Sequence, residues 1–428
     1  MTDALTVVLD DQVAGIVSRL PQGRLRFDYD PSYGGRAGAT PLSLSMPIQV
    51  ASHADHVIRP WLAGLLPENE AVISRWARHF HISTSSPFAL LGTPVGEDCA
   101  GAVRFAPPHQ LERILQRPGA VDSLTKAGVA SRLRDLREDS TAWLGRSFTG
   151  QFSLAGVQPK TALLLRQGRW GVPSGSTPTT HILKPATAGF DDHDLNEHLC
   201  LSTARRVGLL AVRTRVLRFG RESALVVDRY DRTIVGSDIR RIHQEDVCQA
   251  LGIQPSKKYQ NEGGPGPRDI ADLLRRTMKP SVADASVWQF ADALIFNWLI
   301  AGTDAHAKNY SLLLAGNQVR LAPLYDVASS LPYGTDERRL RFAMKIGGDY
   351  RVFPQHNTWP DAARDLGVDA DRIVARVREL ASSLPQALSE AAGAPEVRAL
   401  TRSLPAKLVD LVADRTARCV MVLDRLSS

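Results

Sequence analysis

The amino-acid sequence predicts an α+β fold with a β-rich first part and a mostly helical last part. Residues 1 to about 105 alternate short runs of strand-forming residues with turns, and residues 106–245 mix strand and helix patterns. After residue 245 the helical pattern dominates. A chain of 428 residues is also too long for one ordinary hydrophobic core. We therefore predict three domains, at residues 1–105, 106–245 and 246–428.

The composition is that of an ordinary globular protein, with 43% hydrophobic and 23% charged residues. No apolar run approaches the roughly 18 to 20 residues that span a membrane. The first residues carry no basic segment followed by an apolar one, so we expect no signal peptide. The four cysteines are far apart in the sequence and match no zinc or disulfide spacing. We therefore expect a cytoplasmic protein.

The net charge is +7 at pH 7, and the sequence pI is near 9.4. Arginines are spread along the chain, which favours a solvated basic surface, with contact to DNA, direct or through a partner, as the alternative. Histidine pairs such as His53 with His56 lack a third ligand at a diagnostic spacing, so we predict no zinc site.

The first elements follow from local patterns of apolar residues and turn formers. Strands are predicted at 5–9 and 24–29, a turn at 31–35, helices at 61–66 and 69–80, and a boundary or surface connection at 106–124.

The middle of the chain continues with strands and one clear helix. Strands are predicted at 161–165 and 180–184, on either side of a flexible stretch at 171–179. Leu195 to Gly208 predicts a helix with glycine as its stop signal. A further apolar strand begins at Ser223, and a hairpin at 310–322 interrupts the helices of the last part.

The stretch from Thr303 to Asp326 carries the strongest chemical pattern. Asp304 stands five positions before Asn309, and Asp326 follows after the predicted hairpin. Phosphoryl transfer needs a carboxylate at the attacking hydroxyl, and an amide oxygen with a second carboxylate to hold Mg²⁺ on the phosphates. The spacing therefore predicts a kinase, and a β-rich lobe before a helical lobe with this loop is the order of a bilobal protein kinase. The alternative is a polar turn in which the spacing is coincidental.

Other segments fit the same chemistry when they are taken in chain order. Lys308, beside Asp304, is well placed to steady the transferring phosphoryl group. The segment from Ser153 to Lys160 has one glycine with small neighbours, which lets backbone N–H groups approach phosphate oxygens. This segment matches neither a Walker A nor a G-x-G-x-x-G loop, and an ordinary turn before a strand is the alternative.

A kinase also needs a lysine on the α- and β-phosphates and a hinge for the adenine. Lys184 ends a short apolar strand, where this lysine belongs, and Glu197 begins the following helix. Glu197 could pair with Lys184, help to hold the metal, or simply favour the helix dipole. The backbone of Asp228, Arg229 and Tyr230 lies where a hinge belongs, although a buried strand with a charged end would show the same pattern.

Taken together, these segments resemble the HipA family of bacterial serine/threonine kinase toxins. The resemblance extends from about residue 5 to the C-terminal helices and is least specific in the last 80 or so residues. The matching segments are PLSLSMP (41–47), GLLPEN (64–69), GEDCAGAVRF (96–105), SLAGVQPK (153–160), THILKP (180–185), ALVVDRYDR (224–232), HQEDVCQALG (243–252), KYQNEGGPG (258–266), GTDAHAKNYS (302–311) and PLYDVAS (323–329).

The resemblance implies a HipA-like, protein-kinase-like fold and a role for each matching residue, with ATP and Mg²⁺ as cofactors. Asp304 would be the catalytic base, assisted by Lys308, and Asn309 and Asp326 would hold the metal. The ATP-binding residues would be Ala155, Gly156, Val157, Gln158, Pro159, Lys160, Lys184, Asp228, Arg229, Tyr230, His306 and Tyr325. Ser153 would be the serine whose autophosphorylation ejects the phosphate loop and silences the kinase.

Two residues depart from the family pattern. Asp228 stands where some members have glutamate, and Pro159 stands where some have an acid. Proline fixes φ and lacks an N–H, so the mobility of the loop at Pro159 is expected to differ.

The resemblance also implies partners. Members of the family pair with HipB, a small helix-turn-helix antitoxin that binds operator DNA, so DNA contact would run mainly through the antitoxin. They phosphorylate aminoacyl-tRNA synthetases, often the glutamyl enzyme, which halts growth and favours persistence. Two rival functions stay open: a small-molecule kinase of the aminoglycoside or choline type, and a catalytically idle subunit that only binds an antitoxin and tightens repression.

Overall fold

The computed structural model describes residues 3–82, 86–186, 191–236, 238–334 and 336–424, in two compact units. Unit 1 consists of Met1–Pro185, Leu217–Ser256 and Ser311–Val319, and unit 2 consists of Ala186–Val216, Lys257–Tyr310 and Arg320–Ser428. Each unit therefore collects segments that are far apart in the sequence. Among the helices of the described ranges, none has an apolar stretch long enough to cross a bilayer.

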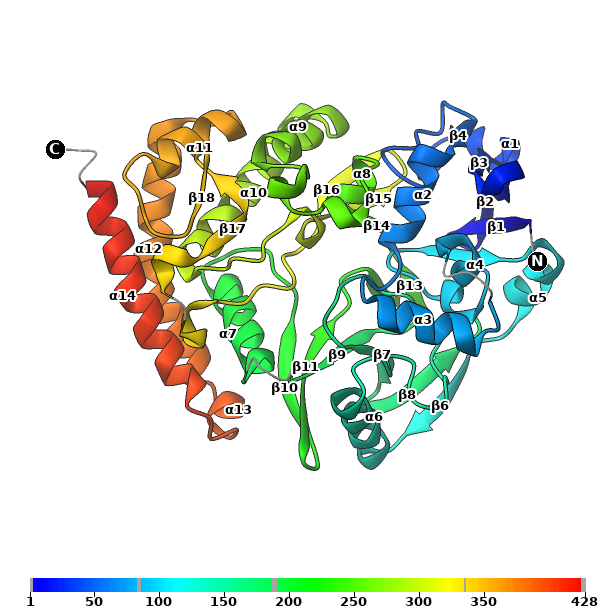
Figure 1. Ribbon diagram of the computed structural model, residues 1–428, viewed down its shortest axis with the longest axis horizontal. Helices are drawn as coiled ribbons and strands as arrows, with labels where there is room; N and C mark the ends of the chain where they lie inside the picture. The colour runs from blue at the N-terminus through cyan, green and yellow to red at the C-terminus, as the bar shows by residue number, and fades with distance from the viewer. Residues whose placement is uncertain (1–2, 83–85, 187–190, 237, 335, 425–428) are drawn as a thin grey trace. The chain divides into compact units, whose positions relative to one another are not determined.

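Unit 1 begins with an antiparallel five-stranded sheet in the order β4-β3-β2-β1-β5 (Figure 1). Its strands are β1 (Ala4–Leu9), β2 (Gln12–Arg19), β3 (Leu25–Tyr29), β4 (Ser52–Ala54) and β5 (Val103–Ala106). The strands predicted at 5–9 and 24–29 are thus confirmed as β1 and β3. The predicted turn at 31–35 is instead the short helix α1 (Pro31–Gly34), because the Asp30 side chain accepts hydrogen bonds from Ser32 N and Tyr33 N and caps a helical turn.

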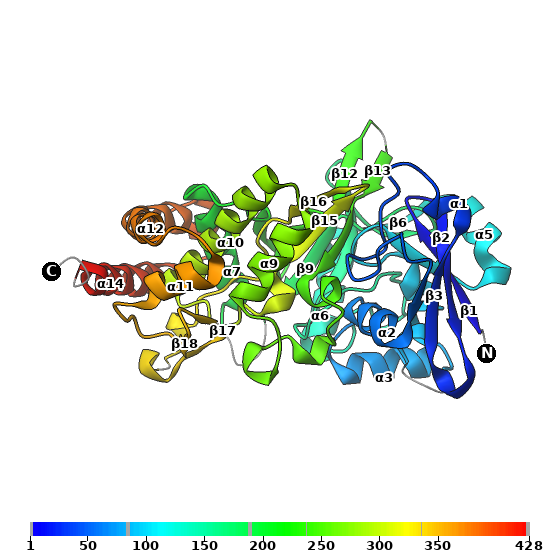
Figure 2. The ribbon, with the colours of Figure 1, turned by 90° about the horizontal axis from the view of Figure 1, so that it is seen from above.

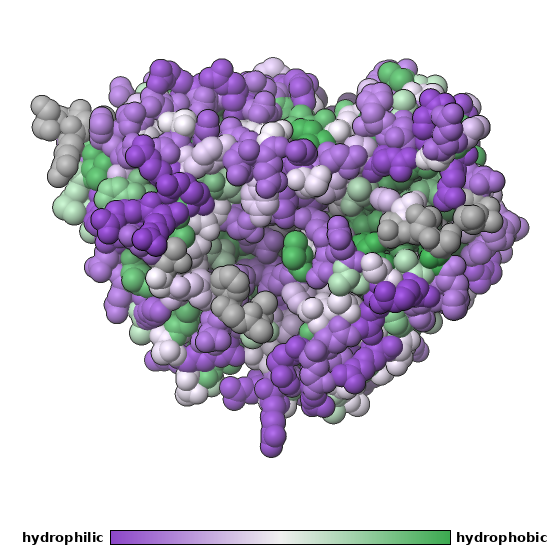
Figure 3. Space-filling view, in the orientation of Figure 1, coloured by the Kyte–Doolittle hydropathy of each residue, from purple (hydrophilic) through white to green (hydrophobic). Residues whose placement is uncertain are grey.

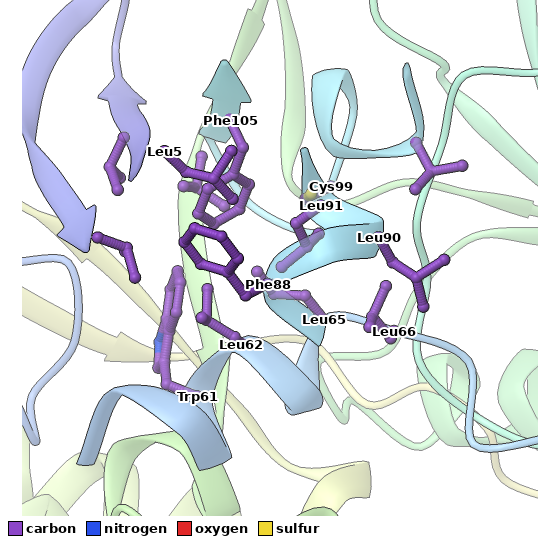
Figure 4. Close-up of a cluster of buried hydrophobic side chains, with 14 of the residues drawn as sticks. Leu5, Trp61, Leu62, Leu65, Leu66, Phe88, Leu90, Leu91, Cys99 and Phe105 are labelled. Carbon is purple, nitrogen blue, oxygen red and sulfur yellow. The ribbon is translucent and has the colours of Figure 1, made fainter. Parts of the chain in front are cut away.

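Three helices pack on this sheet and close the first core. They are α2 (Asp55–Gly64), α3 (Glu70–His79) and α4 (Pro87–Leu91). Trp61 and Leu62 of α2 pack with Phe88 of α4 and with Leu5 and Phe105 of the sheet, all at most 2% exposed (Figure 4). The predicted helix at 69–80 is confirmed as α3, which begins after Asn69, whose side chain accepts from Ala71 N.

A second sheet of unit 1 carries five complete strands in the order β11-β9-β7-β8-β6. They are β6 (Ala120–Leu124), β7 (Thr161–Arg166), β8 (Arg169–Ser174), β9 (His181–Pro185) and β11 (Glu222–Asp228), with α5 (Leu111–Gln116) before β6 and α6 (Lys126–Glu138) packed against β9 and β11. The predicted strands at 161–165, at 180–184 and from Ser223 are confirmed. The segment at 106–124, predicted as a boundary or surface connection, contains α5 and the exposed edge strand β6, which pairs with β8.

The flexible stretch predicted at 171–179 is wrong in part, because β8 continues to Ser174. Gly171 and Pro173 are residues that normally weaken a strand. At Gly171 an added Cβ would lie 2.3 Å from Cγ1 of Val121 on β6, so the glycine permits the close approach of the two strands. Glycine and proline therefore suggested a flexible segment where the chain forms a strand, and Gly171 is needed there for close packing against β6.

The remaining strands of unit 1 form hairpins and a short pairing. The boundary between the units falls inside β10 (Thr214–Phe219) and β16 (Gln318–Leu321). The turn between β10 and β11, with Arg218 and Arg221 exposed, is a hydrophilic projection at the bottom of Figure 3. The hairpin of β12 (Arg232–Val235) and β13 (Asp238–Arg241) projects from unit 1 in Figure 2. The last elements are β14 (His243–Asp246), α8 (Val247–Ala250) and β15 (Ser311–Ala315), which pairs with β14.

Unit 2 is mostly helical, as the sequence predicts for the chain after residue 245. Its helices are α7 (His193–Arg206), α9 (Pro267–Thr277), α10 (Pro280–Ile300), α11 (Thr358–Leu366), α12 (Ala370–Ala392), α13 (Pro395–Arg398) and α14 (Leu404–Asp424). The helix predicted at 195–208 is confirmed as α7. Helix α12 packs against α7, α11 and α14 (Figure 1). The hairpin of β17 (Arg341–Ile346) and β18 (Asp349–Arg351) was not predicted.

Candidate active site

The predicted catalytic loop follows α10 in unit 2 and turns tightly. The last helical residues of α10 are apolar and buried, and Ala301 adopts a left-handed conformation (φ 52°) that ends the helix. The N–H of His306 then donates to the carbonyl of Asp304 (2.8 Å), and the N–H of Asn309 donates to the carbonyl of His306 (2.9 Å). This turn leaves the Asp304 side chain exposed while its neighbours from His306 to Asn309 are buried.

The Asn309 side chain connects the two acidic positions of the motif. Its Nδ2 donates to the backbone carbonyls of Asp304 (2.9 Å) and Asp326 (3.3 Å). The amide nitrogen is thereby committed, so the side-chain oxygen is the atom of Asn309 available to a metal. Asp326 is held at φ 57°, a left-handed conformation that is uncommon outside glycine and that often marks functional positions.

Asn309 and Asp326 fit Mg²⁺, since this ion takes oxygen ligands and one or two protein carboxylates beside phosphates and water. In the part of the chain that the structure describes, no group of three or more His, Cys, Asp or Glu side chains could hold a metal ion. A magnesium site here would therefore depend on oxygen atoms from the bound nucleotide as well.

Three further predicted residues belong to this loop or contact it. Lys308 is buried, and its backbone carbonyl accepts from the hydroxyl of Tyr325 (2.6 Å). His306 is buried, with its ring edge-on to Tyr259 at a centroid distance of 5.1 Å. Unit 2 therefore brings together Asp304, His306, Lys308, Asn309, Tyr325 and Asp326.

A pocket of about 520 Å³ opens beside Asp304. Its walls come from Tyr259, Asn261 and Glu262, from Thr303 and Asp304, and from Arg341 to Ala343 and Tyr350. The N–H of Ala343 donates to the carbonyl of Thr303 (2.9 Å), so β17 is joined to the catalytic loop. These walls could not be predicted from the sequence, because about 40 residues of chain separate them from Asp304 and no local pattern signals the contact.

In unit 1, Ser153 is fully buried. Its hydroxyl donates to the carbonyl of Leu65 (2.7 Å), and its N–H donates to the carbonyl of Asp98 (3.0 Å). Both partners belong to the N-terminal part of unit 1. Phosphorylation of this serine would therefore require the segment to leave its place.

The segment that follows is a compact loop. Gly156 has φ 102°, which favours glycine, and its carbonyl accepts from the N–H of Glu68 (3.0 Å). The Lys160 ammonium donates to the carbonyl of Ala155 (2.7 Å) and lies 5.2 Å from the Trp143 ring centroid. Val157 is 54% exposed, and Gln158 and Pro159 are half-buried.

Lys184 lies on β9 opposite Leu225 of β11, and its side chain is buried. Glu197 is buried in the first half of α7. Lys184 belongs to unit 1 and Glu197 to unit 2, so their pairing stays a prediction.

The segment after β11 ends in a buried ion cluster. Arg229 donates through its backbone N–H to the carbonyl of Thr180 (2.9 Å) and through its guanidinium to Asp231 (3.0 and 2.7 Å). Burial alone would raise the pKa of Asp231, but the charges of Arg229 and Arg232 lower it well below its ordinary value. Asp98, which pairs with Arg232 (2.9 Å), has its pKa lowered for the same reason.

The two neighbouring predicted hinge residues have contacts of their own in unit 1. Asp228 lies 3.2 Å from the imidazole Nε2 of His181, and the Tyr230 hydroxyl bonds with the Gln244 side chain. Because the polar groups of Arg229 are engaged inside unit 1, its contact with adenine stays a prediction.

Comparisons with known proteins agree with this architecture. The family model of the HipA N-terminal domain matches residues 5–106, and that of the HipA-like C-terminal domain matches residues 152–388. The chain is 33% identical over 388 residues to a putative kinase, Y4mE, of Sinorhizobium fredii, which covers 90% of this chain and 91% of the relative. It is 30% identical over 371 residues to the serine/threonine-protein kinase toxin HipA of Shewanella oneidensis, covering 82% of this chain and 80% of the relative.

The solved structure of the Shewanella oneidensis HipA, HipB and operator DNA complex contains a chain of the same fold. The TM-score is 0.84 at 25% sequence identity, over 98% of both chains. This likeness confirms the predicted α+β, kinase-like fold.

Proposed function

Because the chain belongs to the HipA family, we propose that it is an ATP- and Mg²⁺-dependent serine/threonine protein kinase, the toxin of a toxin–antitoxin pair. One observation carries the enzymatic part of this proposal. The Asp304 carboxylate stands exposed at a pocket, while Asn309 binds the backbone of both Asp304 and Asp326. This arrangement supports Asp304 as the base for the acceptor, with Asn309 and Asp326 as two oxygen ligands for a metal.

Each residue at this site has a proposed task. Asp304 accepts the proton of the attacking serine or threonine hydroxyl, and the Lys308 ammonium steadies the charge that develops on the transferred phosphoryl group. Asn309 and Asp326 hold Mg²⁺ through their side-chain oxygens. When bound, this ion neutralises phosphate charge. The pocket between Tyr259 and Tyr350 receives the chain that carries the acceptor hydroxyl.

Residues of unit 1 are proposed to bind the nucleotide. The backbone N–H groups of Ala155 to Lys160 suit phosphate oxygens, with Gly156 allowing their close approach. Lys184 contributes positive charge to the phosphates, and the backbone of Asp228 to Tyr230 faces the adenine. The compact loop conformation at Gly156 supports the first of these roles.

Autophosphorylation at Ser153 is proposed as the inactivating step. A phosphate adds about −1.5 to −2 charge at pH 7, which the buried site beside Leu65 could not accommodate. We expect intact-mass measurement and peptide mapping to find phosphate on Ser153 in the wild-type chain and none in Asp304→Asn. Phosphate on Ser153 in both proteins would contradict transfer by the chain itself.

The physiological substrate and partner are proposed from the family. The substrate would be an aminoacyl-tRNA synthetase, with the glutamyl enzyme first in order, and its inhibition would stop translation and promote growth arrest or persistence. A HipB-like antitoxin would bind the kinase and carry it to operator DNA, in keeping with the complex solved for the Shewanella relative. The cytoplasmic location stays a prediction.

One experiment separates the proposal from its rivals. The full-length chain is incubated with Mg²⁺ and γ-³²P-ATP, with glutamyl-tRNA synthetase, an aminoglycoside or choline as acceptor. We expect label on serine or threonine of protein. Label only on a small molecule would show the rival kinase, and no ATP-dependent labelling of any acceptor, the chain included, would favour the idle subunit.

A further inference from the structure

We propose that Tyr259 is a positioning residue for phosphoryl transfer, because its hydroxyl donates a hydrogen bond to Oδ1 of Asp304 (2.8 Å). The bond holds the carboxylate so that Oδ2 faces the acceptor. This inference rests on the proposed function of Asp304 as the base. In the step concerned, the acceptor oxygen bonds to the γ-phosphorus, the bond from phosphorus to the leaving ADP oxygen breaks, and the hydroxyl proton passes to Oδ2.

The loop that carries Tyr259 is closed on itself. The Tyr259 carbonyl accepts from the N–H groups of Glu262 and Gly264, both at 3.0 Å. An added Cβ at Gly264 would lie 2.1 Å from the carbonyl oxygen of Lys257 and 2.8 Å from that of Tyr259. A side chain at position 264 would therefore collide with this closed form of the loop.

The same loop is attached to the catalytic loop. The N–H of Ala307 donates to the Lys258 carbonyl (3.3 Å), and the Tyr259 ring packs edge-on against the ring of His306 at an interplanar angle of 79°. The Lys258 ammonium lies 5.2 Å from the centroid of the Tyr259 ring. The phenol is thus fixed relative to the backbone that carries Asp304.

An exposed aspartate otherwise turns freely about its side-chain bonds. Within the described residues, the Tyr259 hydroxyl is the one side-chain donor recorded for the Asp304 carboxylate. Hydrogen bonds to charged groups are among the strong ones, and a small misplacement of a reacting group is costly. Loss of the hydroxyl should lower the transfer rate about 10- to 100-fold, less than the roughly 10²- to 10⁴-fold effect of losing a base.

The test uses full-length wild-type protein, Tyr259→Phe, Asp304→Asn, the double variant, and Tyr333→Phe as control. Tyr333 also lies in unit 2, and its hydroxyl bonds with Asn196 (3.1 Å), away from Asp304. The readout is the initial rate of ³²P incorporation into the chain against ATP concentration. Tyr259→Phe should lose maximal rate at an unchanged half-saturating ATP concentration, Tyr333→Phe should match wild type, and the double variant should equal Asp304→Asn.

Other outcomes overturn the inference. A wild-type maximal rate in Tyr259→Phe does so, and so does a change confined to the half-saturating ATP concentration. The double variant could also have a lower maximal rate than Asp304→Asn, by the same factor that separates Tyr259→Phe from wild type. That result would show a general structural loss, since a folding defect would appear in both backgrounds. If the wild-type protein transfers no phosphate to itself or to another protein, the proposed kinase function is wrong. A defect that appears only in Tyr259→Phe leaves that function intact, so the two failures can be told apart.

Discussion

At the scale of single residues, the side-chain amide of Asn309 connects Asp304 with Asp326. The side-chain NH₂ group of Asn309 donates hydrogen bonds to the backbone carbonyls of Asp304 and Asp326. The backbone carbonyls of both acids therefore share one side-chain donor, and the side-chain oxygen of Asn309 stays available. Aspartate at this position would keep an oxygen ligand but lose both donated hydrogen bonds.

Replacing Asp304 or Asp326 by asparagine should impair different steps of the reaction. Asp304→Asn should lower phosphoryl transfer about 10²- to 10⁴-fold with little change in ATP affinity, because it removes a base. Asp326→Asn should weaken Mg²⁺-dependent ATP binding about 10-fold or more, because it removes a metal ligand. Rates of ³²P transfer and calorimetric titration of ATP, with and without Mg²⁺, measure the two effects. An Asp304→Asn protein that transfers phosphate at the wild-type rate would refute the assignment.

The site residues that could be predicted from the sequence lie within one short motif. The spacing of Asp304 and Asn309 is set by a single turn, so the sequence carries it directly. Tyr259 contacts the same carboxylate from 45 positions away, and nothing in its surroundings specifies that distance. Only the closed loop at Gly264, attached to Ala307, brings it there.

At the scale of elements, β14 joins the two family-matched parts of unit 1 through alternate side chains. Nε2 of His243 donates to the carbonyl of Leu42 (2.9 Å), and the Glu245 carboxyl accepts from the N–H of Leu44 (2.8 Å) and from the Trp61 indole (3.2 Å). Residues two apart on a strand share a face, so both reach the same segment. Burial lowers the pKa of His243 to about 4 and raises that of Glu245 to about 8.

These shifts predict a pH-dependent stability. Glu245 keeps its proton in the folded state, so its contribution is present below its ordinary pKa and is lost as pH rises toward 8. His243 has the opposite effect, but only below its ordinary value of 6.5. Between pH 6.5 and 8 the free energy of unfolding of unit 1 should fall, by at most about 1.4 kcal/mol per pH unit from this group.

Denaturant titrations at pH 6.5, 7.0, 7.5 and 8.0 measure this slope. Glu245→Gln cannot titrate and should flatten it, whereas Glu112→Gln, on the exposed face of α5, should leave it unchanged. An unaltered slope in Glu245→Gln would assign the pH dependence to other groups.

Elements with regular apolar patterns were predictable, and those that depend on distant partners were not. β1, β3, β7 and β9 were found from their apolar runs. β8 could not be predicted because the need for glycine at position 171 arises only from its close contact with Val121 of β6. β17 could not be predicted because nothing local shows that Ala343 bonds to Thr303.

At the scale of the whole molecule, the net charge of +7 affects how the protein is expected to bind DNA. We expect the kinase alone to bind DNA weakly and without sequence preference, and to join an operator complex when a HipB-like antitoxin is present. Exposed arginines such as Arg218 and Arg221 would then add phosphate contacts, which strengthen the salt dependence and carry no sequence information. Mobility-shift titrations at two salt concentrations, with either protein and with both, test this. Sequence-specific nanomolar binding by the kinase alone would contradict it.

Unit 1 is formed from three separate segments of the chain, so it can be completed only after the last of them has been synthesised. Its last segment, Ser311–Val319, supplies β15, the strand that pairs with β14. A ribosome adds residues in the N-to-C direction at about 5 to 20 per second, so β14 is complete before its partner strand β15 (Ser311–Ala315) has been made. A nascent chain released before that point lacks both the partner strand of β14 and Asp326. Such a fragment would therefore lack one of the two residues proposed to hold Mg²⁺.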